Sequence, residues 1–356
     1  MTKTTFRMKN TSKIFFICCA LFFSAPIFAQ YQLDPNYEPI KITEPFCTYP
    51  IKAVSTYEKV PAVQSAIASI RRGDTPCSTF IVDYNGFSPE AEAAFQFAVD
   101  IWSYTIESSI PISVEATFET NANPNNLGSA RSDGVYALMA GPGEPTYWYP
   151  SALAEKLSDE ELTTDPFPFP GPTNDIIANF NDTQPWYFGL DANPPGNQFD
   201  FVTVVLHELG HGLGFSGIFG KTIDTDDDDI DDQGRIRVQG TSPVWDSFIE
   251  NGTGDAMLSF ADPSAALLAE FTGNDLFSNS PLATTANGGT LPKIFAPGSF
   301  QGGSSYSHWD TATFPASNEN SLMTPTAGAG EANHNPGPIT IGFRRHGLDL
   351  MCFIKC

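Results

Sequence analysis

The chain has 356 residues, of which 41% are hydrophobic and 17% charged, and its formal net charge at pH 7 is −23. This length and composition are sufficient for one large domain with a substantial core. The acidity disfavours nucleic acid and anionic membranes as partners, because neutralising phosphates requires clustered Lys and Arg side chains.

Residues 1–29 have the pattern of a secretory signal peptide. Four basic residues precede an apolar stretch at 14–23, and the segment ends in Ser-Ala-Pro-Ile-Phe-Ala. Such a segment is removed and does not enter the fold. The apolar stretch is shorter than the about 20 residues that span a membrane. We therefore expect cleavage after Ala29 and a secreted or periplasmic protein with no transmembrane anchor, and an uncleaved anchor is the alternative.

Residues 30–77 contain several prolines and little periodicity, which indicates an extended N-terminal segment or a short pro-region. Four cysteines follow the signal peptide, and an even count in an exported protein predicts disulfides with three connectivities. The local option pairs Cys47 with Cys77 and closes a loop between Cys352 and Cys356 in the tail 352–356. The other options tie the N-terminal segment to the C-terminus.

A folded domain is expected over residues 78–351. Residues 79–84 and 112–118 predict strands, and residues 89–107, with Ser88 as N-cap, predict a helix between them. Residues 175–181 predict another strand. An insertion is expected at about 218–300, with a helical stretch at 263–271, and residues 338–351 predict a final helix.

The run His-Glu-Leu-Gly-His at 207–211 places two histidines four residues apart on a predicted helix. Residues at this spacing lie on one face, so His207 and His211 can bind one metal ion. Glu208 then lies beside the metal, where it can act as general base on an activated water. This pattern predicts a Zn²⁺ site that hydrolyses peptide bonds.

The surroundings of this motif favour a metal site over a surface helix with two incidental histidines. An apolar run at 200–206 leads into it, and Gly210, Gly212 and Gly214 stand where an ordinary helix avoids glycine. We expect the helix to stop at Gly214 with a positive φ, which glycine tolerates.

Residues 224–234 are crowded with aspartates, and a hard cation relieves the repulsion between carboxylates. Ca²⁺ is therefore a second expected metal, with Asp224, Asp226, Asp228 and Asp232 as its ligands. The pattern departs from an EF-hand, which would need glycine at position 229 and glutamate at position 235. A solvated acidic loop is the alternative.

A catalytic zinc takes three protein ligands, so a third ligand is needed beyond the helix. In the compact metzincin signature it follows soon after the motif, at the position of Gly217 here. His308 instead lies in a Ser-His-Trp-Asp segment, followed by Ser-Leu-Met-Thr-Pro at 321–325. His334, in a Gly/Asn/Pro loop, and His346, beside two arginines, are interpreted as residues that do not bind the metal.

With these segments the chain resembles the leishmanolysin-like branch of the metzincins, in which HExxHxxGF is followed by a distant His-Trp-acidic segment and a Leu-Met turn. The resemblance covers about residues 78–349, and its insertion is longer than the family pattern. It implies His207, His211 and His308 as Zn²⁺ ligands, Glu208 as general base, and Met323 as the turn beneath the metal.

The predicted fold is α/β of the α+β kind, a metzincin-like domain with a twisted mixed sheet, an active-site helix and an irregular C-terminal subdomain. By resemblance, residues 175–181 are the edge strand that pairs with extended substrate. Tyr306 is a candidate oxyanion donor, with a buried structural tyrosine as the alternative. A further hypothesis is that Cys47 blocks the zinc as a thiolate in a latent form.

We therefore predict an exported zinc endopeptidase that acts on protein or peptide substrates, with no oligomeric state indicated. The first alternative is a zinc peptidase whose third ligand is a carboxylate, Asp246 or Glu250. The second is an inactive or latent, calcium-stabilised binding protein on a peptidase fold, against which the intact Glu208 argues.

Overall fold

The computed structural model describes residues 31–45, 47–141, 144–163, 171–228 and 230–346. The expected signal peptide, the tail 352–356 and the last residues of the expected C-terminal helix lie outside the described residues. None of the helices in the described part of the chain has the length and hydrophobicity of a membrane span.

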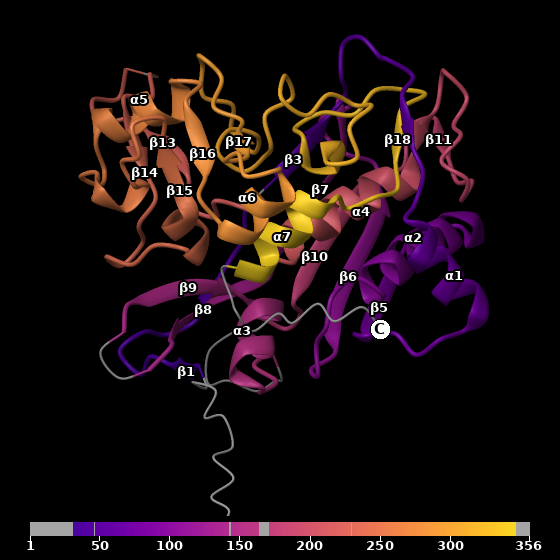
Figure 1. The fold of residues 1–356 in the computed structure, drawn as a ribbon, viewed down its shortest axis with the longest axis horizontal. Coiled ribbons are helices and arrows are strands. Elements are labelled where there is room, and N and C mark those ends of the chain that lie inside the picture. Colours follow the sequence, from indigo (N-terminus) through magenta and orange to yellow (C-terminus); the bar gives the residue numbers. More distant parts are fainter. Residues whose placement is uncertain (1–30, 46, 142–143, 164–170, 229, 347–356) are drawn as a thin grey trace, which may run out of the picture.

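The structure is of mixed α/β class, and its central element is a five-stranded sheet of order β3-β7-β10-β6-β5 (Figure 1). Strands β5, β6 and β10 are parallel to one another, whereas β7 is antiparallel to β10 and β3 is antiparallel to β7. The five strands are β3 (Cys47–Pro50), β5 (Phe80–Asn85), β6 (Ile112–Glu119), β7 (Asn126–Ser132) and β10 (Ile176–Asn181).

Two helices of the first half and centre of the chain lie against this sheet, α2 (Pro89–Ser103) and α4 (Phe201–Gly212) (Figure 1). Helix α2 begins as predicted, because the Ser88 hydroxyl accepts a hydrogen bond from the Ala91 N–H. It ends four residues before the predicted position, where Tyr104 leaves helical geometry. The predictions of strands β5, β6 and β10 are confirmed.

A second sheet is built on β8 (Gly134–Met139), which pairs with β9 (Thr146–Pro150) and with two short strands of the N-terminal segment, β1 (Gln32–Leu33) and β2 (Ile40–Lys41). Helix α3 (Ser151–Ser158) follows β9 directly. The N-terminal segment thus contributes strands to both sheets.

The C-terminal half consists of short strands and helices joined by turns, as predicted. A two-stranded pair, a three-stranded sheet and the packed helices α6 and α7 are its main units. The elements are β13 (Lys221–Ile223), β14 (Gln233–Arg235), η1 (Val244–Phe248), β15 (Ile249–Asn251), η2 (Met257–Ser259), α5 (Ala265–Thr272), β16 (Leu276–Ser278), α6 (Pro281–Ala286), β17 (Lys293–Ile294), η3 (Ser321–Met323), β18 (Ala332–Asn333) and α7 (Pro338–His346).

The prediction that residues 175–181 form the substrate-binding edge strand is wrong. Strand β10 is an interior strand with β7 on one side and β6 on the other. Its apolar side chains are buried on both faces of the sheet, which is typical of an interior strand. The strand next toward the edge is β7, and its outer side is covered by β3.

The N-terminal segment is more ordered than its lack of periodicity indicated. Besides β1, β2 and β3, it contains β4 (Lys59–Val60), which pairs with β18, and helix α1 (Gln64–Arg72), which ends at Gly73 in the left-handed conformation. Two further short strands, β11 (Trp186–Tyr187) and β12 (Phe199–Asp200), precede α4.

Candidate metal centre

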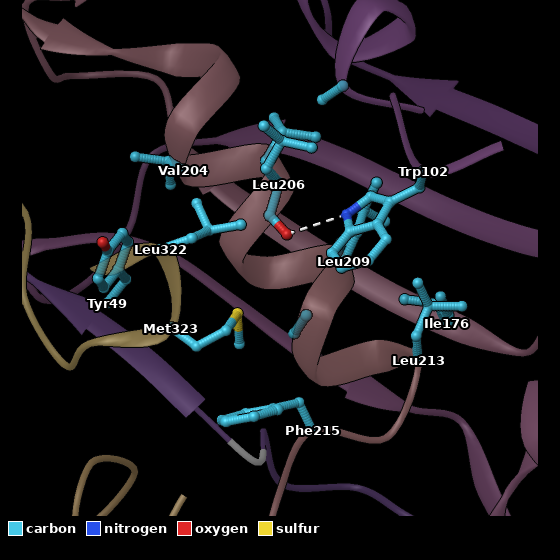
Figure 2. Close-up of a cluster of buried hydrophobic side chains, with 14 of the residues drawn as sticks. Tyr49, Trp102, Ile176, Val204, Leu206, Leu209, Leu213, Phe215, Leu322 and Met323 are labelled. Atoms are coloured by element: carbon cyan, nitrogen blue, oxygen red, sulfur yellow. Dashed lines mark hydrogen bonds between the residues drawn. The ribbon is translucent and has the colours of Figure 1, made fainter. Parts of the chain in front are cut away.

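Helix α4 carries the motif 207–211, and every one of its residues is buried. It begins at Asp200, whose carboxylate accepts a hydrogen bond from the Thr203 N–H at 2.8 Å. An apolar helix of this kind is stable because it packs on all sides, here against α2, β7 and β10. The Trp102 indole donates a hydrogen bond to the Leu206 carbonyl and ties α2 to this helix (Figure 2).

Two glycines explain how the helix fits and where it ends. A Cβ on Gly212 would lie 2.4 Å from the Ile176 side chain, so glycine is required for the close approach of α4 to β10. Gly214 has a φ of 108°, which confirms the predicted helix end.

The structure brings His207, His211 and His308 together, although His308 lies far from the other two in the chain. The Nε2 atoms of His207 and His211 are 3.0 Å apart, and that of His308 lies 3.2 Å from His211 Nε2 and 3.3 Å from His207 Nε2. A fourth donor joins them. The Cys47 Sγ lies 3.3 Å from His308 Nε2 and 3.6 Å from His207 Nε2, and all four residues are buried.

The hydrogen bonds of the other ring nitrogens fix the tautomers of the three histidines. Each Nδ1 lies 2.6–2.7 Å from a backbone carbonyl, that of Leu322, Phe215 or Ser304. A carbonyl can only accept, so each Nδ1 carries the proton and a neutral ring leaves its Nε2 lone pair free.

Burial favours the neutral form of two of these rings. It lowers the pKa of His207 well below its ordinary value and lowers the pKa of His308 to about 4. Three lone pairs therefore converge on one point, an arrangement that is repulsive unless a cation lies between them.

The spacing of the four donors fits a tetrahedral metal ion. With metal–nitrogen bonds of about 2.0–2.1 Å and a metal–sulfur bond of about 2.3 Å, a tetrahedron has nitrogen–nitrogen edges of about 3.4 Å and nitrogen–sulfur edges of about 3.6 Å. The observed separations lie within a few tenths of an ångström of these values. The Cys/His₃ cluster can therefore hold a metal ion.

Cys47 is a free, fully buried thiol, so the local option among the three disulfide connectivities, which pairs Cys47 with Cys77, is not formed. Cys77 is itself disulfide-bonded, which leaves it unable to pair with Cys47. Cys47 lies in β3 opposite Ala130 of β7, and this register directs its side chain to the histidines. Burial, and then the nearby Glu208, raise the pKa of the Cys47 thiol in the absence of a metal.

Tyr49, two residues further along β3, was not singled out from the sequence. Its ring stacks on the His207 imidazole with centroids 3.6 Å apart and an interplanar angle of 6°. The register of β3 with β7 shifts between Thr48 and Pro50, but Cys47 and Tyr49 are both buried whereas Thr48 between them is only partly buried. Cys47 and Tyr49 therefore cover the same side of the metal centre.

Glu208 is buried beside the cluster, and neither of its carboxylate oxygens has a hydrogen-bond partner of ordinary geometry among the described residues. Burial raises its pKa well above the ordinary value, and the nearby Ala130 N–H opposes this shift. Unpaired buried carboxylates are costly. The charge of a metal ion in the cluster would favour the ionised form of this side chain.

The Leu322-Met323 turn lies against the metal helix, in η3. A Cβ on Gly210 would lie 2.7 Å from the Met323 sulfur, so the methionine packs directly against α4 (Figure 2). The Leu322 carbonyl accepts from His207, and the Met323 carbonyl accepts from the Trp309 N–H. The turn thus joins the segments that carry two histidines of the cluster.

The alternative carboxylate ligands are engaged elsewhere. The Tyr306 hydroxyl donates a hydrogen bond of 2.7 Å to Asp246, and burial raises the pKa of Asp246 to about 8. Glu250 accepts a hydrogen bond from Asn279. Neither carboxylate belongs to the Cys/His₃ cluster. Because its hydroxyl is bound to Asp246, Tyr306 fits the buried structural alternative better than the oxyanion donor.

The histidines interpreted as outside the site differ in what the structure shows. His334 is buried and its Nε2 lies 2.7 Å from Asp200, the N-cap of α4. It therefore supports the metal helix from the end opposite His211. The side chain of His346 lies outside the described residues.

Three of the four expected calcium ligands gather. Asp224, Asp226 and Asp228 offer oxygens within 4.8 Å of one another, and all three are exposed. Asp232 does not join them, and its carboxylate accepts a hydrogen bond from Thr225. Exposed acidic groups of this kind are common without an ion, so calcium binding stays a prediction.

The chain was compared with protein-family models, curated proteins and solved structures. A protein-family model described as SPBPB7E8-like matches residues 85–230, which include α4 but neither Cys47 nor His308. No curated protein and no solved structure matches the chain.

Proposed function

We propose that this protein is a zinc-dependent endopeptidase of metzincin-like fold, held in a latent state in which Cys47 is the fourth metal ligand. Zinc is proposed because three imidazoles and one thiolate are ligands that it prefers, in the tetrahedral arrangement that it adopts. Export through residues 1–29 is part of this proposal.

The observation that carries the proposal is Glu208. A purely structural zinc site is closed by four ligands and needs no base beside it. Here a carboxylate with no ordinary hydrogen-bond partner among the described residues is buried next to the donors, and the cost of that burial is explained if Glu208 acts in the reaction.

When bound, zinc supplies a Lewis acid that polarises the scissile carbonyl and acidifies the attacking water. Glu208 accepts a proton from that water and transfers it to the leaving amine. The carbonyls of Leu322, Phe215 and Ser304 hold the three imidazoles in the required tautomer and orientation.

Strand β3 lies where an extended substrate would pair with the sheet. It is antiparallel to β7 and places Cys47 at the metal centre. If β3 leaves, β7 presents unpaired backbone N–H and C=O groups beside Glu208, and an extended peptide can add to such an edge. The N-terminal segment therefore blocks both the fourth ligand position and the strand-pairing site.

The test compares the wild-type mature chain with Cys47→Ala and with Cys47→Ala/Glu208→Ala. We expect Cys47→Ala to cleave an unfolded protein substrate at least tenfold faster than wild type, because one ligand position is open. The double variant is expected to keep its zinc and to lose activity by a factor of about 10²–10⁴, as for loss of a general base. A zinc chelator should abolish cleavage.

Equal cleavage by Cys47→Ala and the double variant would show that Glu208 is not the base. A second candidate function is a structural zinc site in a protein without peptidase activity, which the fourth protein ligand favours. That candidate predicts zinc in all three proteins, cleavage by none of them, and no cleavage after the N-terminal segment is cut away.

A further inference from the structure

An open cavity of about 360 Å³ lies between α1, α2 and the loop that follows β11. Its volume is within the range of small-molecule sites, about 300–1,000 Å³. Ile67 and Ile70 of α1 and Phe97 of α2 give it an apolar wall, and Leu190, which is 46% exposed, also lines it. Figure 1 shows α1 and α2 side by side, with β11 above them.

Helix α1 turns one face toward this cavity. Gln64, Ile67 and Arg71 line it, at spacings of three and four residues that place them on one side of a helix. Of the residues of α1, all of which the structure describes, only Ala66 is buried, so the isoleucines are covered only in part. A ligand with apolar surface would cover them further and gain free energy by excluding water.

His334 is a buried member of the cavity wall. Its Nε2 lies 2.7 Å from the Asp200 carboxylate, which only accepts when ionised, so Nε2 carries the proton and the Nδ1 of the neutral ring is an acceptor. That Nδ1 has no hydrogen-bond partner among the described residues. A buried acceptor without a partner is costly, and a ligand that donates a hydrogen bond here would remove this cost.

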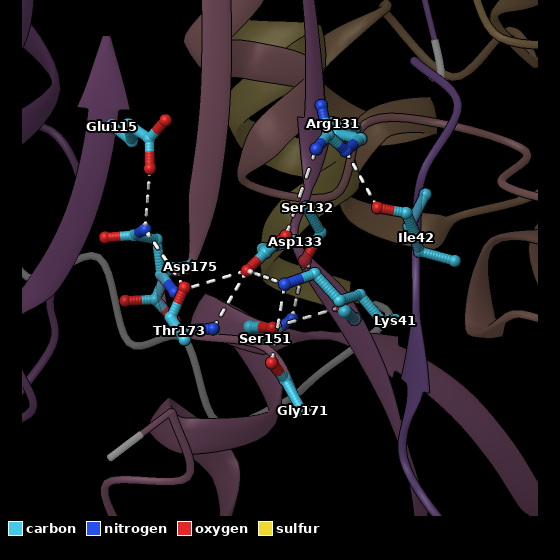
Figure 3. A network of polar contacts seen from close by, with 12 residues as sticks. Lys41, Ile42, Glu115, Arg131, Ser132, Asp133, Ser151, Gly171, Thr173 and Asp175 are labelled. Atoms are coloured by element: carbon cyan, nitrogen blue, oxygen red, sulfur yellow. Dashed lines mark hydrogen bonds and ion pairs between the residues drawn. The ribbon is translucent and has the colours of Figure 1, made fainter. Parts of the chain in front are cut away.

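A buried carboxylate elsewhere in the chain shows complete pairing without a ligand. Asp133 accepts a hydrogen bond from the Thr173 N–H at 2.9 Å (Figure 3). It also lies 3.8 Å from the Lys41 ammonium and 4.0 Å from the Arg131 guanidinium (Figure 3). Both of its oxygens thus have partners within the chain. His334 Nδ1 differs from this pattern, which points to a partner from outside the chain.

Two charged side chains of opposite sign line the same cavity, Asp191 and Arg71. The Tyr187 hydroxyl donates a hydrogen bond of 2.8 Å to Asp191, and chiefly this bond lowers the pKa of the carboxyl, which is therefore ionised near pH 7. The Arg71 guanidinium has no ion-pair partner among the described residues, whereas the adjacent Arg72 pairs with Asp74. The cavity thus offers an anion, a cation and a ring-nitrogen acceptor beside an apolar wall.

We propose that this cavity binds a free α-amino acid with an apolar side chain. The ammonium group donates to Asp191 and to Nδ1 of His334, the carboxylate pairs with Arg71, and the side chain packs on Ile67 and Phe97. A simple amine would leave Arg71 without a partner, and a simple carboxylic acid would leave Asp191 without one. The two opposite charges therefore select a zwitterion.

This inference does not depend on the proposed function. The cavity lies at the N-terminal end of α4, where His334 contacts the N-cap Asp200, and none of the described residues that line it belongs to the Cys/His₃ cluster. Binding to the cavity is measured directly, without any peptidase activity, so the failure of one proposal leaves the other unaffected.

The first test is calorimetric titration of the mature chain with L-leucine and with L-phenylalanine. We expect saturable binding of at least one of them, at one site per chain. The N-acetyl derivative of the same amino acid lacks the ammonium and the carboxamide derivative lacks the carboxylate, so each is expected to bind at least tenfold more weakly. Absence of binding by both free amino acids would overturn the inference.

The same two derivatives resemble the ends of peptide chains. The N-acetyl compound represents a C-terminal residue, and the carboxamide represents an N-terminal residue. If either binds as tightly as the free amino acid, the cavity accepts a peptide end and the proposed ligand is wrong.

The second test places the binding in the cavity by substitution. Arg71→Gln and Asp191→Asn are each expected to weaken binding at least fivefold, and Ile67→Trp should abolish it by filling the cavity. The matched control is Arg72→Gln, which removes the neighbouring guanidinium outside the cavity and should bind like wild type. Circular dichroism checks that each variant is folded. Equal weakening by Arg71→Gln and Arg72→Gln would contradict the proposed site.

The third test is nitrogen NMR of the histidine side chains during the titration. The ligand is expected to shift the Nδ1 resonance of His334, because this atom gains a hydrogen bond, and to leave those of His207 and His211 unchanged. A His334 resonance that does not move at saturation would overturn the inference.

Discussion

The chemistry of the candidate metal centre depends on the tautomers of its three histidines. Three backbone carbonyls hold the Nδ1 protons of His207, His211 and His308, and this leaves three Nε2 atoms to face Cys47. The motif at 207–211 predicted two of these donors, because their spacing is local. His308 needed the resemblance. Cys47 was only a hypothesis from the sequence, because Cys77 was available as a disulfide partner, and the three-dimensional structure is what brings it to the three histidines.

Replacing His308 with alanine tests the distant ligand. We expect the zinc affinity to fall at least tenfold, because one of the four donors is lost, while Asp226→Asn in the exposed acidic loop leaves it unchanged. Competition with a chromophoric chelator measures both. Unaltered affinity in His308→Ala would remove His308 from the ligand set.

Replacing Glu331 with glutamine tests the anchor of the blocking segment. Burial raises the pKa of Glu331, but the hydrogen bonds from Thr56 and Lys52 together lower it by more. The ionised carboxylate of Glu331 therefore stabilises its contact with both residues. We expect Glu331→Gln and Lys52→Met each to raise severalfold the rate at which the full mature chain cleaves a protein substrate. If both variants stay as slow as wild type, this contact does not help to hold the segment.

At the level of secondary structure, the sequence pattern was sufficient to predict an element when the element's own residues determine it. Helix α2 has its N-cap, proline and apolar face within one segment, and β6 shows its alternation directly. The edge of the sheet could not be predicted in this way. Strand β7 contains Gly, Ser and Asn, and its role follows from its partners β10 and β3, which lie far away in sequence.

The fit of α4 against β10 makes a separate prediction. In Gly212→Ala the new Cβ would overlap the Ile176 side chain, and overpacking of this kind costs about 1–3 kcal/mol. The better helix propensity of alanine offsets about 1 kcal/mol of that. Urea unfolding should show a net loss of stability, partly recovered by adding Ile176→Ala. Gly141→Ala, where the added methyl meets no other atom, is the control and should unfold like wild type.

For the molecule as a whole, the burial of carboxyl groups makes the free energy of unfolding depend on pH. Burial raises the pKa of Glu155 to about 9, with the nearby Asp175 carboxylate adding to the shift. The folded chain therefore holds a proton that the unfolded chain releases near its ordinary pKa of 4.5. The free energy of unfolding should fall as the pH rises from about 4.5 to about 9.

Glu155→Gln removes this titration. We expect the variant to lose less stability than wild type between pH 5 and about 9, as measured by urea unfolding at a series of pH values. A slope identical to that of wild type would mean that Glu155 is already ionised in the folded protein.

The whole-molecule arrangement places residues from the N-terminal segment, the central helix and the C-terminal half around one point. Zinc-edge X-ray absorption spectroscopy of the full mature chain, loaded with one equivalent of zinc, tests this arrangement directly. The account predicts one sulfur at about 2.3 Å and three nitrogens at about 2.0–2.1 Å, with the sulfur lost in Cys47→Ala. A spectrum with no sulfur, or with oxygen ligands only, would contradict it.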